Sequence, residues 1–443
     1  MKTKTNRTLV CLGILIPTLF FFSLSVVGAK EEIKIGVVTP MKFLVGDIHQ
    51  KGVTMGAEDI NAVGGVHVGG KNHKLKIFGA DSNELLSVVD AVNAVERLIT
   101  INKVDFLLGS VRSEAALAML EVAAENRKIF MTLGAASPAL PMKVAKDYDK
   151  YKYWFRGASA NSIYQANYIF IYLEFVARAV KEQLGIDNPR VAVVAEKAVW
   201  ADPIVKLIKA KAPKVGVEFV GAWRPSATAV DLSSELSAVR RAKAHIILFF
   251  AAGPVDVTIS RQAGELQIPA IVVGTSVDAT TQDHWKTTDG NCNYRMVGNT
   301  SGNVAITQKT RPFWKRYSQE YGEFPCQYTT AIYDTMFVLK EAIERSGNIE
   351  SEAVIKELEK TDYQGVSGRY AFHPLGHKFP HDRIYGPDYI PMFGTQWQNG
   401  DLVVVWPDGR GVMTQKGWEK VHYEGTKKLI LPPWMMDHWK KNK

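Results

Sequence analysis

Two adjacent residues at the start of a predicted helix, Arg112 and Ser113, have side chains suited to holding an anion. They follow the apolar run 104–108 and Gly109, and apolar residues recur at helical spacing after them. The N-terminus of a helix presents unpaired N–H donors and the positive end of the helix dipole, and it therefore attracts carboxylates. We expect the Ser113 hydroxyl and the Arg112 guanidinium to complete such a site. The alternative is that Ser113 only caps its own helix while Arg112 faces solvent.

A second turn suited to ligand binding follows one strand later. The apolar run 129–133 predicts a buried strand, and Ala135 and Ala136 come directly after it, between a glycine and a proline. Small residues leave the backbone open to a ligand, and the proline fixes the direction in which the chain leaves. Ligands of open α/β sheets bind beyond the carboxyl ends of the strands. The sequence therefore predicts that Ser113 and Ala135 lie at one site.

Strands and helices alternate along much of the chain, which is typical of parallel sheets covered by helices on both faces. The expected strands include residues 33–38, 75–79, 190–195, 217–221, 245–250 and 270–273, and the expected helices include residues 46–61, 87–101, 162–183 and a segment around 204–209. The glycine patterns that bind phosphate in nucleotide-binding folds follow none of these strands. The predicted fold class is α/β, with two doubly wound parallel-sheet domains.

The first 29 residues have the pattern of a secretory signal peptide. Basic residues precede an apolar run from Leu9 to Val27, and small residues at 27–29 form a cleavage site. A retained membrane anchor is the alternative, which Pro17 and the cleavage site disfavour. Cys11 lacks the neighbours of a lipid-modified cysteine, so we expect a mature protein that is free in the periplasm or outside the cell.

Charge and length narrow the class of protein further. Removal of residues 1–29 takes away three basic residues and no acidic ones, which lowers the formal net charge from +9 to +6. The charges are scattered, so no nucleic-acid partner is expected. The 443 residues exceed what a single core usually holds, which favours two domains.

Cysteines and histidines give no sign of a metal or another cofactor. Cys292 and Cys326 lack zinc-ligand spacing, and we expect two separate thiols, although an oxidising compartment favours pairing. His373, His377 and His381 have a spacing like that of metal ligands, but they alternate with proline and glycine. This pattern favours a solvated surface loop over a rigid metal site.

Several short motifs occur in an order that is specific as a set. They are residues 33–40, Gly46-Asp47 with Gly52, residues 59–62 with 64–65, the two turns described above, and residues 325–328 leading into 331–334. In this order they resemble the leucine/isoleucine/valine-binding protein family, the periplasmic solute-binding subunits of ABC transporters. The resemblance extends to about residue 375, and the longer C-terminal tail is similar only loosely.

The resemblance implies the type I periplasmic binding fold, in which a ligand cleft lies between two domains and three chain crossings form the hinge. We expect crossings near Gly157, Thr300 and Arg369. The first domain would then comprise residues 30–157 and 301–368. The second would comprise residues 158–300 and 369–443, with an extended C-terminal tail.

The resemblance also assigns roles to residues of the two turns. Ser113 matches the serine that binds the ligand carboxylate, and Ala135 matches a position whose backbone takes part in recognition. Ala136 stands where the family has a threonine. The acid that pairs the ligand ammonium falls on Ser276, with Asp278 two positions further on.

Aromatic residues complete the expected site. Trp200 stands where the family has a tyrosine, and Tyr328 matches an aromatic residue of the second crossing. Together with Phe43 they could flank a flat or apolar group, although Phe43 and Trp200 could equally pack within their own domains. Because an ammonium ion buried without a carboxylate is unfavourable, we expect that an unmodified branched-chain amino acid is not the best ligand.

The predicted function is that of a periplasmic, monomeric binding subunit that captures a small carboxylate or amino-acid-like solute and delivers it to a membrane permease. One alternative is a binding protein for an aromatic or aliphatic acid or an amide, and another is a ligand sensor that presents to a membrane receptor. A secreted α/β enzyme is disfavoured because we find no nucleophile elbow and no zinc-protease motif. We assign no catalytic residue.

Overall fold

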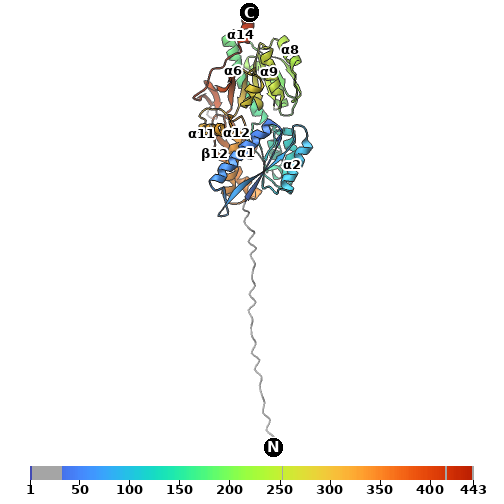
Figure 1. The fold of residues 1–443 in the computed structure, drawn as a ribbon, viewed down its shortest axis with the longest axis vertical. Helices are drawn as coiled ribbons and strands as arrows, with labels where there is room; N and C mark the ends of the chain where they lie inside the picture. The colour runs from blue at the N-terminus through green and yellow to red at the C-terminus, as the bar shows by residue number, and fades with distance from the viewer. Residues whose placement is uncertain (2–31, 252, 415–416, 442–443) are drawn as a thin grey trace.

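The structure, a computed structural model, describes residues 1, 32–251, 253–414 and 417–441. Apart from Met1, the predicted signal peptide lies outside the described residues. Among the helices that are described, none has both the length and the apolar character needed to cross a membrane. The chain forms two lobes, each built around its own sheet (Figure 1).

The first lobe contains a six-stranded sheet with the order β2-β3-β1-β4-β5-β6. All neighbouring strands run parallel except β2 and β3. Its strands are β1 (Glu32–Thr39), β2 (Val66–Val68), β3 (Lys71–Asp81), β4 (Phe106–Gly109), β5 (Phe130–Thr132) and β6 (Trp154–Arg156).

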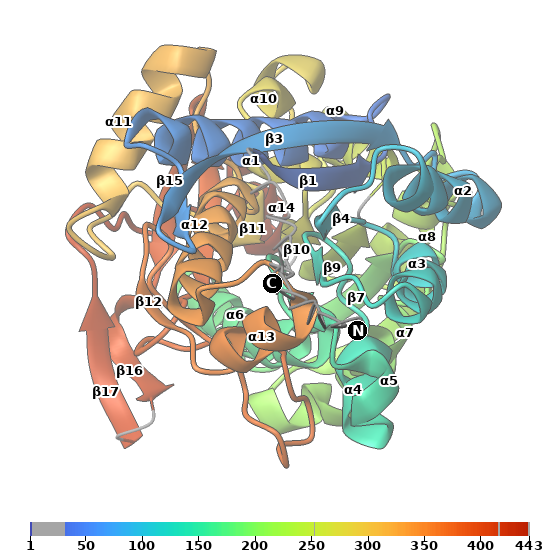
Figure 2. The same cartoon turned by 90° about the horizontal axis from the view of Figure 1, so that it is seen from below.

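Helices cover both faces of this sheet, and each face has its own apolar cluster. One cluster includes α1 (Leu44–Ala62), α12 (Thr329–Ser346) and α13 (Ser351–Leu358), and the other includes α2 (Val88–Thr100), α3 (Ser113–Glu125) and α4 (Ala139–Lys146). Figure 2 shows the two sets on opposite sides of the sheet. The short helix α5 (Tyr148–Tyr151) follows α4, and α11 (Thr310–Tyr321) precedes α12.

The second lobe contains a seven-stranded sheet with the order β15-β14-β11-β10-β9-β7-β8. Its strands are β7 (Arg190–Ala195), β8 (Glu218–Trp223), β9 (Ile246–Ala251), β10 (Ile271–Ser276), β11 (Met296–Asn299), β14 (Phe393–Gln398) and β15 (Asp401–Trp406). Strands β7 to β11 pair in parallel, whereas β14 and β15 are antiparallel.

Helices also pack on both faces of the second sheet. One apolar cluster includes α6 (Ser162–Leu184) and α7 (Asp202–Lys211), and the other includes α8 (Ser233–Arg241) and α9 (Val255–Glu265). The connections contain η1 (Ala212–Val215), η2 (Asp278–Thr280) and α10 (Asp283–Thr287). The α/β fold class with two sheet domains, predicted from the alternating pattern, is confirmed.

Local sequence explains several of these elements. All six residues of β9, IILFFA, are buried, as expected of a central parallel strand covered on both faces. The Ser87 hydroxyl accepts a hydrogen bond from the Asp90 N–H and caps α2. Gly185 ends α6 with a φ of 69°, a left-handed conformation that glycine adopts without strain.

The chain passes between the lobes three times. It leaves the first sheet after β6 and enters α6, and it leaves β11 for α11. We expected the third crossing near Arg369, but Tyr370, Phe372 and Ile390 pack in the core of the first lobe. The hairpin of β12 (Asp362–Gln364) and β13 (Arg369–Ala371) is therefore followed by further first-lobe packing. The chain joins the second sheet only at β14, so this packing favours a crossing after Ile390.

The C-terminal tail packs on the second lobe. It forms the hairpin of β16 (Asp408–Thr414) and β17 (Gly417–His422) and the helix α14 (Pro433–Lys441). The indole N–H groups of Trp434 and Trp439 donate to the carbonyls of Ile268 and Pro269 at 3.0 and 2.7 Å. These carbonyls precede β10, so α14 covers the end of that strand away from its carboxyl end.

Candidate functional site

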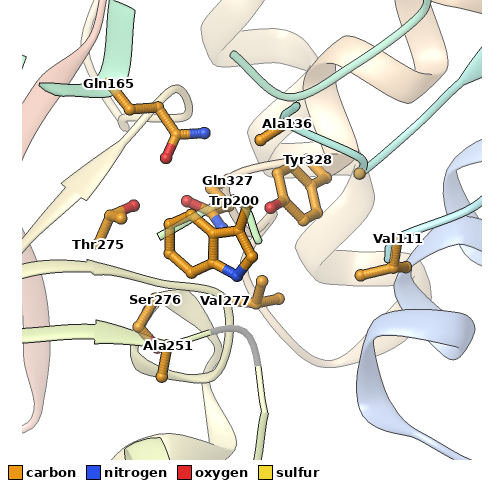
Figure 3. Close-up of a pocket in the computed structure, with 11 residues that line it drawn as sticks. Val111, Ala136, Gln165, Trp200, Ala251, Thr275, Ser276, Val277, Gln327 and Tyr328 are labelled. Atoms are coloured by element: carbon orange, nitrogen blue, oxygen red, sulfur yellow. The ribbon is translucent and has the colours of Figure 1, made fainter. Parts of the chain in front are cut away.

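A cavity lies where the carboxyl ends of strands from both sheets face one another. About 340 Å³ of space in and around it, open solvent included, is free of protein atoms. Both lobes and the connection before α12 contribute to its wall (Figure 3). The lining residues are Val111, Gly134, Ala136, Gln165, Trp200, Ala251, Thr275, Ser276, Val277, Gln327 and Tyr328.

The strands place the lining residues where the sequence predicted a site. Val111 follows β4, and Gly134 and Ala136 follow β5. In the second sheet, β9 ends at Ala251 and β10 ends at Ser276. Gly109 permits the tight turn after β4, because its φ is 140° and an added Cβ would lie 1.9 Å from the Val38 carbonyl oxygen.

Two aromatic side chains, Trp200 and Tyr328, come to the cavity from opposite lobes. Trp200 lies between β7 and α7 and belongs to the second apolar cluster, whereas Tyr328 precedes α12 and belongs to the first. The Trp200 indole N–H donates to a carboxylate oxygen of the buried Glu196 at 2.7 Å. The other Glu196 oxygen accepts the Gly253 N–H at 3.1 Å. The hydrogen bond to the Glu196 carboxylate therefore fixes the position of the Trp200 indole in the cavity wall.

The polar side chains that line the cavity are neutral. Gln165 donates from its amide nitrogen to the Ala160 carbonyl at 2.7 Å. The Ser276 hydroxyl accepts the Ala279 N–H at 3.3 Å. Among the described residues, the side-chain amide of Gln327 and the hydroxyl of Thr275 have no hydrogen-bond partner. Figure 3 shows the Gln165 and Thr275 side chains on one side of the Trp200 indole.

The turn before α3 is organised by a carboxylate that the sequence did not reveal, Glu84. One of its oxygens accepts hydrogen bonds from the backbone N–H groups of Val111 and Arg112 at 3.0 and 2.9 Å and from the Ser110 hydroxyl at 2.8 Å. The Ser82 hydroxyl donates to the other oxygen at 3.0 Å. Burial raises the pKa of Glu84, and these hydrogen bonds oppose that shift.

Arg112 and Ser113 lie beside this turn, outside the cavity wall. Arg112 is the N-cap residue of α3, and Ser113 is its first helical residue. The Ser113 hydroxyl accepts the Ser137 N–H at 3.1 Å, so it links the two predicted turns instead of capping its own helix. The Arg112 guanidinium lies 3.4 Å from Glu114 and 3.9 Å from Glu196. Arg112 is thus largely enclosed and does not face solvent.

The structure brings together four of the nine predicted site residues in the cavity wall, namely Ala136, Trp200, Ser276 and Tyr328. Ala135 is buried in the apolar cluster of α2 and α3, next to the lining residues. Phe43 precedes α1 and packs against the first-lobe core. Asp278 begins η2, two residues after β10, and burial raises the pKa of its carboxyl group to about 8.

Several cavity residues were not predicted. Val111, Gly134, Ala251, Thr275 and Val277 border predicted strand ends, so the strand-end rule carried a signal for them. Gln165 lies in the first turn of α6 and Gln327 in the loop before α12. A single polar residue in a helix or loop gives no sequence signal of the direction in which it points.

Among the described residues, no group of three or more His, Cys, Asp or Glu side chains could hold a metal ion. However, His381 is buried and contacts the Trp154 carbonyl and Glu359, each at 2.9 Å. The expectation of a solvated loop is therefore wrong at His381. Cys292 and Cys326 are both buried and free, in agreement with two separate thiols.

Comparison with known proteins places this geometry in a family. The family model described as "Periplasmic binding protein" matches residues 32–399. The chain is 24% identical over 404 residues to Leu/Ile/Val-binding protein homolog 7 of Brucella abortus (strain 2308), with 87% of this chain and 94% of the relative covered.

Solved structures of similar fold include the branched-chain amino acid transporter substrate-binding protein LivJ from Streptococcus pneumoniae in complex with isoleucine. It is 19% identical with a TM-score of 0.68, over 84% of this chain and 99% of that chain. A solute-binding protein of an ABC transporter from R. palustris in complex with benzoate is 14% identical, with a TM-score of 0.70 over 89% and 99%. This is a family of solute-binding proteins and not of enzymes. The chain therefore belongs to the periplasmic binding protein family that includes the Leu/Ile/Val-binding proteins.

Proposed function

We propose that this chain is the substrate-binding subunit of an ABC importer, working as a monomer in the periplasm after removal of residues 1–29. It captures a small organic solute between its two lobes and delivers it to a membrane permease. The observation that carries the proposal is the cavity between the two sheets, whose wall comes from both lobes. The chain connections between the lobes supply a hinge about which the cavity opens and closes.

The cavity favours a flat or apolar solute. Trp200 and Tyr328 contribute aromatic surface from the two lobes. Ala136 and Ala251 also line the cavity, and their small side chains leave room for a ligand beside the aromatic rings. This lining supports the alternative of an aromatic or aliphatic acid or amide over an unmodified branched-chain amino acid. Isoleucine and benzoate in the two solved structures named above show that both kinds of ligand occur on this fold.

The test is to identify what the mature protein holds. Mass spectrometry of protein purified without denaturation is expected to reveal a small bound molecule. A thermal-shift screen of amino acids, amides and aromatic and aliphatic acids then measures binding. Ligand at 100 times its dissociation constant adds about 2.7 kcal/mol to the free energy of unfolding. If no small solute binds and small-angle scattering detects no compaction with any of them, the proposal is wrong.

Delivery to a permease needs a separate measurement. Uptake of the identified solute is expected to fall when the gene is deleted and to return when it is restored. Normal uptake in the deletion strain, with binding intact in vitro, would instead favour the sensor role.

A further inference from the structure

We infer that the ligand is an uncharged molecule that carries a carboxamide or a similar neutral donor and acceptor group on a flat or apolar body. This inference rests on the proposed function and names the substrate class of the same cavity. Four observations carry it: the neutral wall, the internal anion at α3, the internal partners of the nearby acids, and two polar side chains without partners.

The first observation is the charge of the wall. None of the described residues that line the cavity is an Asp, Glu, Lys, Arg or His, and the polar groups are two amides, two aliphatic hydroxyls, a phenol and an indole. A carboxylate or an ammonium ion that leaves water for such a wall loses its hydration and meets no opposite charge. Transfer of an unpaired ion into a buried site is strongly unfavourable.

The second observation is that a carboxylate of the protein already occupies the turn that leads into α3. The backbone N–H groups of Val111 and Arg112 in this turn donate to Glu84. Two of the donors to Glu84 are backbone N–H groups, which only donate, and this arrangement matches an ionised carboxylate. A second carboxylate at this turn would be repelled by the first.

The same is true of the side chains that the sequence assigned to an anionic ligand. The Ser113 hydroxyl accepts the Ser137 N–H, and the Arg112 guanidinium has Glu114 and Glu196 within 4 Å. Both are thus already engaged by groups of the protein.

The third observation concerns the acids that could pair with an ammonium ion. Glu196 accepts the Trp200 indole N–H and the Gly253 N–H, and it lies behind the wall. Asp278 lies outside the wall, and burial, reinforced by the charge of Asp256, raises its pKa to about 8. At pH 7 the carboxyl group of Asp278 is therefore mostly uncharged, and both oxygens of Glu196 already accept hydrogen bonds from groups of the protein.

The fourth observation is that two polar side chains of the wall are available to a ligand. Gln327 and Thr275 line the cavity, and no hydrogen bond within the described chain engages their side chains, whose polar atoms are accessible from the cavity. The Gln327 backbone is fixed, because its N–H donates to the Thr280 hydroxyl and its carbonyl accepts from the Thr300 hydroxyl. A ligand that fills the cavity excludes water from these groups, and polar groups without partners are costly once they are buried, so the ligand is expected to supply the partners.

A carboxamide matches these groups better than an acid does. The side-chain amide of Gln327 presents both N–H donors and a carbonyl acceptor, and the Thr275 hydroxyl can also act in both ways. A carboxamide can satisfy all of these, whereas a carboxylate has acceptors only and leaves the Gln327 carbonyl without a donor. Trp200 and Tyr328 then contact the apolar body of the ligand.

The test uses matched pairs that differ only in charge. Calorimetry on the mature protein, freed of bound ligand, compares benzamide with benzoate and nicotinamide with nicotinate, with isoleucine as the zwitterion. We expect the amide of at least one pair to bind about tenfold or more tightly than its acid, a difference of about 1.4 kcal/mol. Mass spectrometry of the co-purified solute is expected to identify an uncharged molecule.

Each other outcome overturns the inference in a different way. If the acids or isoleucine bind as tightly as the amides, or the co-purified solute is ionised, the substrate class is wrong while the solute-binding function stands. If nothing co-purifies and no compound of either kind binds, the proposed function fails as well.

A variant pair tests the role of the wall itself. Gln327→Glu places an acid in the cavity and is expected to weaken binding of the preferred amide about tenfold or more, a loss of about 1.4 kcal/mol. Gln364→Glu makes the same chemical change at an exposed position of β12 and is expected to leave binding unchanged. Should Gln327→Glu fail to fold, Thr275→Val removes the other unpartnered group with little change in shape. Unchanged amide affinity in the folded variant contradicts the inference.

Discussion

The Arg112 guanidinium of the first lobe lies 3.9 Å from the Glu196 carboxylate of the second lobe. The same carboxylate accepts the indole N–H of Trp200, which lines the cavity. A second contact follows beside it, where the Val199 N–H donates to Glu114 at 3.3 Å. The start of α3 therefore contacts the second lobe beside the cavity, and the same Glu196 carboxylate also holds the Trp200 indole.

Replacement of Arg112 by alanine is expected to weaken this contact between the lobes. The variant loses the ion pair between the lobes, and the closed form, which binds the ligand, becomes less populated. We expect the affinity for the co-purified solute to fall about fivefold, or about 1 kcal/mol, the upper range for a partly exposed ion pair. Calorimetry measures the affinity, and small-angle scattering measures the degree of closure.

The control is Arg369→Ala, which removes an exposed ion pair with Asp362 within one hairpin. It is expected to change neither closure nor affinity. If Arg112→Ala behaves like this control, the contact with Glu196 does not hold the lobes together.

Ser113→Ala separates the two roles of this serine. In the structure its hydroxyl accepts the Ser137 N–H, so the alanine variant leaves a buried donor without an acceptor. We expect the free energy of unfolding to fall by about 1 to 3 kcal/mol, measured by urea denaturation. The carboxylate-binding role predicted from the sequence requires a different result, a clear loss of ligand affinity with stability preserved.

Asp278 is expected to make stability fall as the pH rises. Burial raises the pKa of its carboxyl group in the folded chain to about 8, from the ordinary value of 3.8. Between these values the folded chain holds a proton that the unfolded chain has lost, so the free energy of unfolding decreases with increasing pH. Asp278→Asn is expected to flatten this slope between about pH 4 and pH 8. Urea denaturation at several pH values measures it, and an unchanged slope would show that Asp278 does not titrate in this way.

The sequence predicted the sheets well, because continuous apolar runs such as residues 246–250 leave few alternatives to a buried parallel strand. It also predicted the edge of the sheets where the cavity lies, since strand order fixes which ends face the other lobe. For the third crossing, predicted near Arg369, the packing favours a later position. Tyr370 and Phe372 are apolar enough for either core, and only tertiary packing assigns them to the first lobe.

The chemistry of the site was harder to predict than its location. Glu84 looks like an ordinary acid in a loop, and its role depends on contacts with residues 26 to 28 positions later. Ser113 was expected to face a ligand, yet its hydroxyl accepts a hydrogen bond from the nearby Ser137 N–H. Hydrogen bonds between turns that follow different strands depend on the relative position of those strands, which the sequence pattern does not specify.

The last prediction concerns the buried ion pair between Arg156 and Asp382, both of which are fully buried. Arg156 ends β6, just before the first crossing, and its guanidinium also donates to the carbonyls of Ala135 and Ser137 in the turn beside the cavity. Asp382→Ala leaves this guanidinium buried without a carboxylate. Loss of one partner of a buried ion pair costs about 3 to 5 kcal/mol, and we expect the free energy of unfolding to fall by that amount.

Two further variants make this prediction specific to the buried pair. Asp362→Ala removes the carboxylate of the exposed pair with Arg369 and is expected to cost at most about 1 kcal/mol. The double variant Arg156→Met with Asp382→Leu removes both charges and is expected to recover much of the stability lost in Asp382→Ala, because apolar groups of similar size replace a buried ion pair at little cost. Urea denaturation of the three variants decides the matter. If Asp382→Ala costs no more than Asp362→Ala, the carboxylate of Asp382 does not stabilise the crossing.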